Sequence, residues 1–230
     1  MGLPSESATT RRKKVKLEVL AEPEANGVKS KELIQSRRAQ ICDAALELFL
    51  EKGVASTTIR DICARSGVNQ ASIYDYFSNK NEILRMLLNQ LWFQTDVATL
   101  PERLNRFEGA RIEEILKDYF REIWRVKRKG TVLIYRAVPH LLEEDKKAMR
   151  AHDTRLINDL AAHLRRMTNL ADDDKRADVI ANLIVFLAAF APMRDWVCRD
   201  IGEEFLASTV SAGVAAMIEN LKQPSSASSS

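Results

Sequence analysis

Apolar residues recur at intervals of three and four along most of this 230-residue chain, and this spacing predicts helices. The most regular repeat lies in residues 111–129, where Ile112, Ile115 and Phe120 share one face. Residues 131–138 look locally like a strand, but they have no partner strand and are assigned to a short helix. Further helices are predicted over residues 31–53, 80–99, 141–167, 172–192 and 202–221. The predicted fold class is therefore all-α.

Residues 57–76 have the pattern of two short helices joined by a tight turn. Thr58 and Asp61 have capping-box spacing, which satisfies backbone N–H groups at a helix start. Gly67 suits the left-handed position just past a helix end, and Asn69 suits the N-cap of the next helix. That helix is expected to bury Ile73, Tyr76 and Phe77 and to expose Gln70, Ala71, Tyr74 and Asp75. The pattern is typical of a helix-turn-helix, whose second helix enters the major groove of DNA.

Several short motifs extend this pattern in both directions. They are Ala-Ala-x-x-Leu-Phe at residues 44–49, Gly53, Thr-Thr-Ile-x-x-Ile at 57–62, Ser-Gly-Val at 66–68 and Ile-Tyr-x-Tyr-Phe-x-x-Lys at 73–80. With these motifs, about 60 residues from Gln35 to Leu91 resemble the TetR family of bacterial transcription regulators. Cys63 departs from the usual small Ala, and Tyr76 stands where His is frequent.

The predicted organisation has five parts. A three-helix helix-turn-helix DNA-binding domain occupies residues 31–80, and a connecting helix follows over residues 81–100. By the resemblance, residues 101–222 form a helical effector-binding and dimerisation domain. Residues 1–30 and 223–230 have compositions that cannot assemble a core, and we expect them to be disordered. The basic block Arg-Arg-Lys-Lys-Val-Lys near the N-terminus is either a solvated tail or an arm that contacts DNA.

The candidate DNA contacts fall into two groups. Gln70, in the first turn of the second short helix, is placed for a bidentate contact with adenine. Thr58, Tyr76 and Lys80 lie at helix starts or flanks, where phosphate is the nearer target. The full set of candidates is Arg37, Arg38, Thr58, Arg60, Asn69, Gln70, Ala71, Ser72, Tyr74, Tyr76 and Lys80. For Arg37 and Arg38, a solvated helix end is the alternative to a phosphate contact.

The second half of the chain offers a ligand site and a dimer surface. Polar aromatic and histidine side chains on its apolar stripes are candidates for ligand binding, with ordinary core packing as the alternative. They are Tyr119, Trp124, Tyr135, His140, His163, Phe186 and Phe190. The segments Ala177–Ala191 and Phe205–Ile218 are apolar over more than one stripe, which favours a homodimer interface through the last two helices.

Charge and motif content narrow the function further. Residues 1–80 carry 13 Lys and Arg against 10 Asp and Glu, and residues 81–230 carry 22 of each, so the net charge of +3 is N-terminal. The three cysteines form no disulfide framework, which fits a reducing cytoplasm. No enzyme motif, metal-ligand spacing, cofactor motif or membrane span is expected.

The predicted function is a DNA-binding transcriptional regulator and not an enzyme. By the resemblance, it is a repressor that an apolar or amphipathic small molecule releases from a palindromic operator. One alternative is a DNA-binding protein of the same fold that acts through protein partners without a small-molecule effector. A second, more remote alternative is an all-α enzyme with an incidental helix-turn-helix.

Overall fold

The structure is a computed structural model that describes residues 20, 31–93, 97–107 and 109–223. In these residues the regular structure is entirely helical, which confirms the all-α class. The helices are α1 (Lys31–Lys52), α2 (Ile59–Ser66), α3 (Gln70–Ile73), α4 (Lys80–Leu88), the π-helix η1 (Asn89–Phe93), α5 (Leu100–Arg106), α6 (Ile112–Val126), α7 (Arg128–Ala137), the 3₁₀ turn η2 (Val138–His140), α8 (Glu143–Thr168), α9 (Lys175–Leu187), α10 (Phe190–Cys198) and α11 (Glu203–Asn220). Apart from Leu20 and Gln223, the predicted disordered tails lie outside the described residues.

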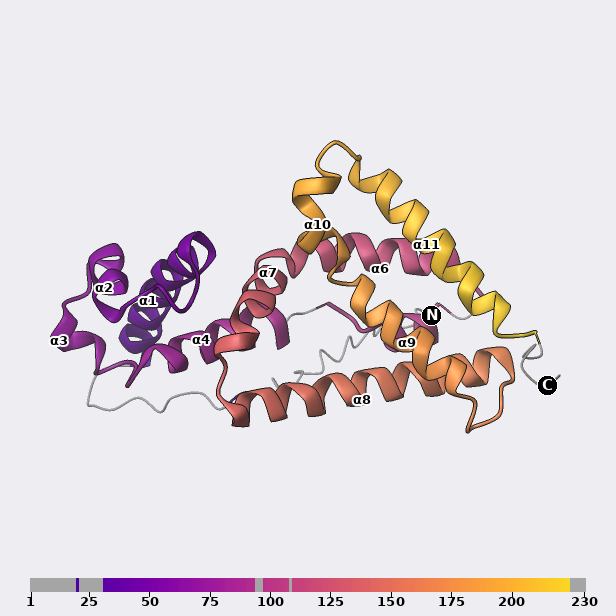
Figure 1. Ribbon diagram of the computed structural model, residues 1–230, viewed down its shortest axis with the longest axis horizontal. Coiled ribbons are helices and arrows are strands. Elements are labelled where there is room, and N and C mark those ends of the chain that lie inside the picture. Colours follow the sequence, from indigo (N-terminus) through magenta and orange to yellow (C-terminus); the bar gives the residue numbers. More distant parts are fainter. Residues whose placement is uncertain (1–19, 21–30, 94–96, 108, 224–230) are drawn as a thin grey trace, which may run out of the picture.

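The molecule is elongated, and its first helices lie at one end (Figure 1). We call α1–α4 the helix-turn-helix unit and the helices from α5 onward the body. Within the body, α6 packs along α11 and α8 packs along α9. One apolar core joins the helix-turn-helix unit to α7 and the start of α8, through Leu133, Ile134 and Met149. A second core lies among α6, α8, α9 and α11.

The predicted helix over residues 80–99 is interrupted. The described chain runs as α4 and then as the π-helix η1, which ends at Phe93. Thr99 starts a new helix, because its side chain accepts from the Glu102 N–H while the Glu102 carboxylate accepts from the Thr99 N–H. Pro101 stands in the first turn of that helix, where its missing N–H costs nothing. The capping pair was visible in the sequence, but the apolar repeat ran across it.

The helix predicted over residues 111–129 is shorter in the structure, because α6 ends at Val126 and a new helix, α7, begins at Arg128 and contains Gly130. A Cβ atom at this position would stand 2.3 Å from the Leu91 carbonyl oxygen. Glycine is therefore required by the close crossing of α7 over η1, and not by a helix end. The short helix expected at residues 131–138 is confirmed as part of α7, which begins at Arg128.

The helix predicted over residues 172–192 breaks before Pro192. Asp174 caps α9 at its start, as the acidic run indicated. The helix ends at Leu187, whose carbonyl accepts a hydrogen bond of 3.0 Å from the indole N–H of Trp124. The chain then bends by 53° into α10, and Pro192 occupies the first turn of that new helix. The tertiary contact from Trp124 therefore lies at the position of the bend.

Polar contacts join the helix-turn-helix unit to the body. Arg85 of α4 donates to the Asp145 carboxylate of α8 at 2.8 Å and also pairs with Glu144. Asp145 is buried, so this ion pair is shielded from solvent. Asn89 of η1 is also buried, and it exchanges two hydrogen bonds with the backbone of Leu20, at 2.8 and 3.1 Å. Polar contacts with α8 and with Leu20 thus fix the segment from the end of α4 to the start of η1.

Candidate nucleic-acid interface

Local capping defines both helices of the helix-turn-helix. The Thr58 hydroxyl accepts from the Asp61 N–H at 3.1 Å, and the Asp61 carboxylate accepts from the Thr58 N–H at 2.8 Å. Gly67 takes the left-handed conformation (φ 69°), and its N–H donates to the Cys63 carbonyl. The Asn69 side chain then accepts from the Ala71 N–H at 2.8 Å and starts α3. Every signal predicted for this turn is present in the structure.

The second short helix has the two faces that the sequence predicts. Ile73, Tyr76 and Phe77 are buried in the core. Gln70, Ala71 and Asp75 are exposed, and so is Tyr74, whose side chain is 51% exposed. Ser72 is half-buried. Because α3 lies at the outer end of the molecule (Figure 1), its exposed face meets no other helix among the described residues.

Some of the candidates at helix ends are exposed to solvent, and others contact groups within the protein. Arg60 is exposed and has no ion-pair partner among the described residues, and Asn69 and Thr58 are exposed caps. Arg37 is exposed and donates to the Gln40 side chain at 2.8 Å. Arg38 is half-buried, with its guanidinium 5.5 Å from the centre of the Phe77 ring. Arg60 and Arg37 therefore have the freest cationic groups in the candidate set.

Lys80 and Tyr76 are held inward. The Lys80 ammonium donates to the carbonyls of Val54 and Thr57, at 2.6 and 2.7 Å, and lies 3.4 Å from the Ala55 carbonyl. Burial lowers the pKa of Lys80. Tyr76 is only 6% exposed. These two side chains thus have intramolecular partners where the sequence predicted phosphate contacts, because α4 starts against the loop between α1 and α2.

Several charged groups of this unit are paired with one another at the surface. The Arg65 guanidinium bridges Glu47 and Glu51 of α1, at 2.9 and 3.0 Å, which raises its pKa. Lys52 pairs with Asp61 at 2.8 Å and lowers the pKa of that carboxyl. All of these groups are substantially exposed, so each pair contributes little to stability. Their main effect is to tie α1 to α2 and so to fix the orientation of α3.

The structure does not bring the seven predicted ligand-binding residues into one site. Tyr119, Trp124 and His163 are buried in the body, and burial raises the pKa of Tyr119 to about 12. Phe190 is half-buried, whereas Tyr135 and His140 are exposed on α7 and η2. Phe186 is 58% exposed on the outer face of α9. For Phe186, the sequence could not show whether the side chain is buried or exposed, because α9 is apolar on two faces.

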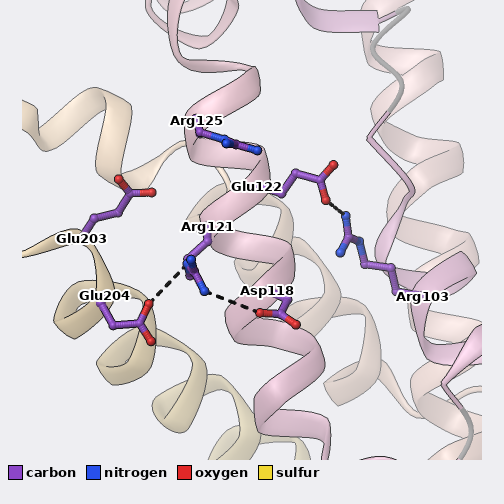
Figure 2. A pocket seen from close by; sticks show the side chains of 7 residues that line it. All are labelled: Arg103, Asp118, Arg121, Glu122, Arg125, Glu203 and Glu204. Carbon is purple, nitrogen blue, oxygen red and sulfur yellow. Dashed lines mark hydrogen bonds and ion pairs between the residues drawn. The ribbon is translucent and has the colours of Figure 1, made fainter.

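Hollows in the body are lined mostly by other residues. Trp124 lines one of about 480 Å³ between α6, α10 and α11. A hollow of about 620 Å³ between α5, α6 and α11 is lined by charged groups (Figure 2). There Arg121 pairs with Glu204 at 3.3 Å and with Asp118 at 3.8 Å, and Arg103 pairs with Glu122. The charged side chains of this second hollow largely satisfy one another.

Sequence reasoning missed a polar group at the junction of α6 and α7. Lys127 falls near the end of the helix predicted over residues 111–129, but in the structure it is half-buried and faces Trp92 of η1. Thr131, one turn later, is completely buried. No local signal marks these positions, because the residues that enclose them come from distant segments. Among the described residues, no group of three or more His, Cys, Asp or Glu is arranged to hold a metal ion.

No single helix among the described residues is both long and apolar enough to cross a bilayer. The bent pair α9 and α10 meets the length and composition criteria only when the two helices are taken together.

The fold and the site define a helix-turn-helix unit joined to a larger helical body. Residues 41–87 match the family of bacterial regulatory proteins, tetR family. The chain is 44% identical over 63 residues to the HTH-type transcriptional regulator TtgR of Pseudomonas putida, which covers 27% of this chain and 30% of that protein. It is 28% identical over 154 residues to the HTH-type transcriptional regulator HbdR of an Aromatoleum species, which covers 64% and 65%. Each match thus spans less than two thirds of the relative.

Solved structures show the same fold over most of the chain. The secondary repressor NalD of the MexAB-OprM multidrug efflux pump in Pseudomonas aeruginosa superposes with a TM-score of 0.57 at 22% identity, covering 81% of this chain and 98% of that one. A TetR-family transcriptional regulator from Bordetella parapertussis gives 0.56 at 22% identity, covering 80% and 93%. The helix-turn-helix domain of this chain belongs to the TetR family, and the described chain has the fold of TetR-family regulators.

Proposed function

We propose that the protein is a sequence-specific transcriptional repressor that binds a palindromic operator as a homodimer and leaves it when a small molecule binds. The observation that carries the proposal is the exposed face of α3, where Gln70, Ala71 and Tyr74 project from a helix fixed by side-chain caps. A helix so presented can place side chains against base edges in the major groove. Arg60 and Arg37 are suited to phosphates on either side.

The proposed dimer surface is the outer face of α9 and α11. On α9, Val179, Leu183 and Phe186 follow helical spacing and are 58%, 41% and 58% exposed. On α11, the exposed side carries small residues at Ala212, Gly213 and Ala216, and no atom lies within 4 Å of a Cβ placed on Gly213. Small residues on an uncovered helix face allow a second helix to approach closely, which supports pairing with the same face of a second copy.

The proposed release mechanism uses α8 as the connection between the body and α4. Arg85 on α4 is paired with Asp145 near the start of α8, and Arg136 of α7 donates to the Leu50 carbonyl at the end of α1. A ligand that shifts α7 or α8 therefore acts on both ends of the helix-turn-helix unit. Binding one of two populated orientations more tightly would change the distance between the two α3 helices and so weaken operator binding.

Selection of bound sequences from random DNA tests the function directly. The expected product is a palindrome with half-sites one helical turn apart. Against that operator, Gln70→Ala should weaken binding by about 1 to 3 kcal/mol and relax preference at one base pair in each half-site. Arg60→Ala is the matched control, because loss of a phosphate contact should lower affinity for all sequences alike and reduce the salt slope by about one per contact. Unchanged base preference in Gln70→Ala would contradict the assignment of α3.

The dimer is tested by placing charge on the exposed side of α11. Ala216→Glu should produce monomers in sedimentation velocity and lose most operator affinity, because a buried unpaired carboxylate cannot be accommodated in an apolar interface. Ala151→Glu on the exposed side of α8 is the control and should remain dimeric. Ala215 is unsuitable for this test, since it packs against the core of its own body. A monomeric wild type at micromolar concentration would exclude the proposed dimer.

A further inference from the structure

A line of polar side chains runs along one face at the start of α7. Lys127 lies between α6 and α7, and Thr131 and Tyr135 follow at intervals of one helical turn, so their side chains point the same way. Opposite Lys127 stands Trp92 of η1, with 5.3 Å between the ammonium nitrogen and the centre of the ring. Gly130 brings η1 this close, because its missing side chain lets the Leu91 backbone pack directly onto α7.

Two of these groups lack a protein partner. The Lys127 ammonium makes no hydrogen bond and no ion pair with the described residues, and it lies over the Trp92 ring. The Thr131 hydroxyl is buried and has no hydrogen-bond partner in the same part of the chain. Burial also lowers the pKa of Lys127 to about 8. A fully buried donor without a partner, such as the Thr131 hydroxyl, is rare in proteins because it forfeits its hydrogen bonds with water.

The helix α8 closes the other side with two adjacent polar residues. His152 meets the edge of the Phe93 ring, with 5.0 Å between ring centres. Asp153 is half-buried and is near enough to perturb both Lys127 and Tyr135, yet no ion pair within 4.0 Å joins it to Lys127. Asp153 also lines a surface hollow of about 330 Å³ between η2 and α8. Asp153 is thus the residue shared by this hollow and the surroundings of Lys127.

The half-buried Lys127 ammonium lies over an indole ring, and burial lowers its pKa. A cation–π contact offsets only part of the cost of this dehydration. Thr131 adds a second unsatisfied donor one turn away, which core packing does not explain. Two donors that point the same way between aromatic rings match the requirements of an anionic acceptor group.

We propose that Lys127 and Thr131 bind the carboxylate of a small molecule whose apolar body lies against Trp92 and Phe93. This proposal rests on the proposed function, because it names the chemical class of the effector. One carboxylate oxygen accepts from the half-buried ammonium and the other accepts from the buried hydroxyl, which satisfies both donors with charge-assisted hydrogen bonds. Asp153 sets a limit on the ligand: a second anionic group near it would be repelled, so monocarboxylates are favoured over dicarboxylates.

The test measures binding of two probes, 2-naphthoate and decanoate, to the full chain by isothermal titration calorimetry. Their neutral amides, 2-naphthamide and decanamide, serve as matched ligands without the charge. Wild type should bind at least one acid about tenfold or more tightly than its amide. Lys127→Met should remove that difference, and Thr131→Val should reduce it. Lys117→Met, on the surface of α6 where Lys117 pairs with Glu114 and Glu204, should leave it unchanged.

The pH dependence gives an independent readout. Acid binding should weaken above about pH 8, as Lys127 loses its proton, and amide binding should not. The other titratable or charged groups on this side are Tyr135, whose pKa is raised, His152, whose pKa is lowered, Asp153 and Arg155. Neutral His152 and neutral Tyr135 do not change charge between pH 7 and 9, so the transition reports on Lys127. In the Lys127→Met variant the transition should be absent.

Several results would overturn the proposal. These are equal affinity for acids and amides, a Lys127→Met variant that binds acids as wild type does, or no binding of either acid up to about 1 mM. Operator binding without ligand is measured in parallel on every variant. A wild type that binds its operator but neither acid refutes the carboxylate site and leaves the proposed DNA-binding function intact. A protein that binds the acids but selects no DNA sequence refutes the function and not the site.

Discussion

A partly buried lysine has opposite surroundings in the helix-turn-helix unit and in the body. Lys80, in the helix-turn-helix unit, directs its ammonium at carbonyls of the loop between α1 and α2. Lys127, in the body, has a ring face and no hydrogen-bond acceptor among the described residues. Burial lowers the pKa of both. The difference indicates that the first lysine completes a structural element, whereas the second retains binding capacity that the fold leaves unused.

The same contrast extends to other buried polar groups. Asp145 is buried and paired with Arg85, and Thr57 is buried with its hydroxyl donating to the Gly53 carbonyl at 2.8 Å. Thr131 is as deeply buried as Thr57 but has no partner in the described chain. Removing a hydrogen-bonded polar group leaves its buried partner without a hydrogen bond, which lowers stability. Removing a polar group that has no partner removes its own desolvation penalty, which raises stability. Substitutions at matched positions should therefore have opposite signs in the two regions.

The largest effect is expected at the buried ion pair between the two regions. Asp145→Ala should lower the free energy of unfolding by about 3 kcal/mol, because it leaves the Arg85 guanidinium largely buried beside only Glu144. Glu144→Ala is the control: its side chain is 71% exposed, and its loss should cost under about 1 kcal/mol. Urea denaturation of both variants checks the prediction. Equal small losses would mean that Glu144 replaces Asp145 and that burial of the pair is unimportant.

Lys80→Met should destabilise the protein by about 2 kcal/mol, because the carbonyls of Val54 and Thr57 lose their donor. The effect on DNA binding should follow from this loss and be the same for every sequence. Lys52→Met is the matched surface control, since Lys52 and Asp61 are both well exposed, and should change stability by under about 1 kcal/mol. An unchanged melting curve for Lys80→Met would show that the predicted phosphate role, and not the intramolecular one, explains this residue.

Lys127→Met should have the opposite sign and raise the free energy of unfolding at pH 7 by on the order of 2 kcal/mol. The pKa of Lys127 is about 8 in the folded chain and near 10.5 when exposed, so the unfolded state binds the proton more strongly. The stability of the wild type therefore rises with pH between these values, and the advantage of the variant shrinks over the same range. Denaturation at pH 7 and pH 10 measures both quantities. A destabilised variant at pH 7 would mean that the ammonium contributes to folding.

Sequence reasoning succeeded where the structural signal is local. Thr58, Asp61, Gly67 and Asn69 each act within three or four residues, and the structure contains every cap that they predict. The two faces of α3 were also predictable, because helical spacing alone separates Ile73 from Gln70. Whether those residues contact DNA as proposed depends on a partner outside the chain.

The same reasoning failed where the deciding contact joins distant segments. Gly130 follows the helix predicted over residues 111–129, but the close approach of the Leu91 backbone is the reason for a glycine at this position. The bend after Leu187 coincides with a hydrogen bond from Trp124, 63 residues away. Lys80 stands apart from other basic residues in the printed sequence, and Lys127 belongs to a basic run, but only the tertiary structure shows which of the two has partners. The ligand-binding candidates were the hardest to place from the sequence, since a polar side chain on an apolar stripe can face a core, a hollow or an interface.

The smallest and sharpest test compares two threonines of equal burial. Thr57→Val should cost about 1 kcal/mol, because the Gly53 carbonyl loses the hydroxyl that it accepts from. Thr131→Val keeps the shape and the branched side chain in α7 but removes a hydroxyl that has no partner, so stability should stay the same or rise by up to about 1 kcal/mol. Thermal unfolding of both variants, with and without 2-naphthoate, measures the contrast. If the acid stabilises wild type and Thr57→Val equally but stabilises Thr131→Val less, the unused hydroxyl is part of the ligand site. Equal destabilisation by the two substitutions would instead mean that Thr131 is satisfied in solution, and the distinction between the two regions would no longer hold at this position.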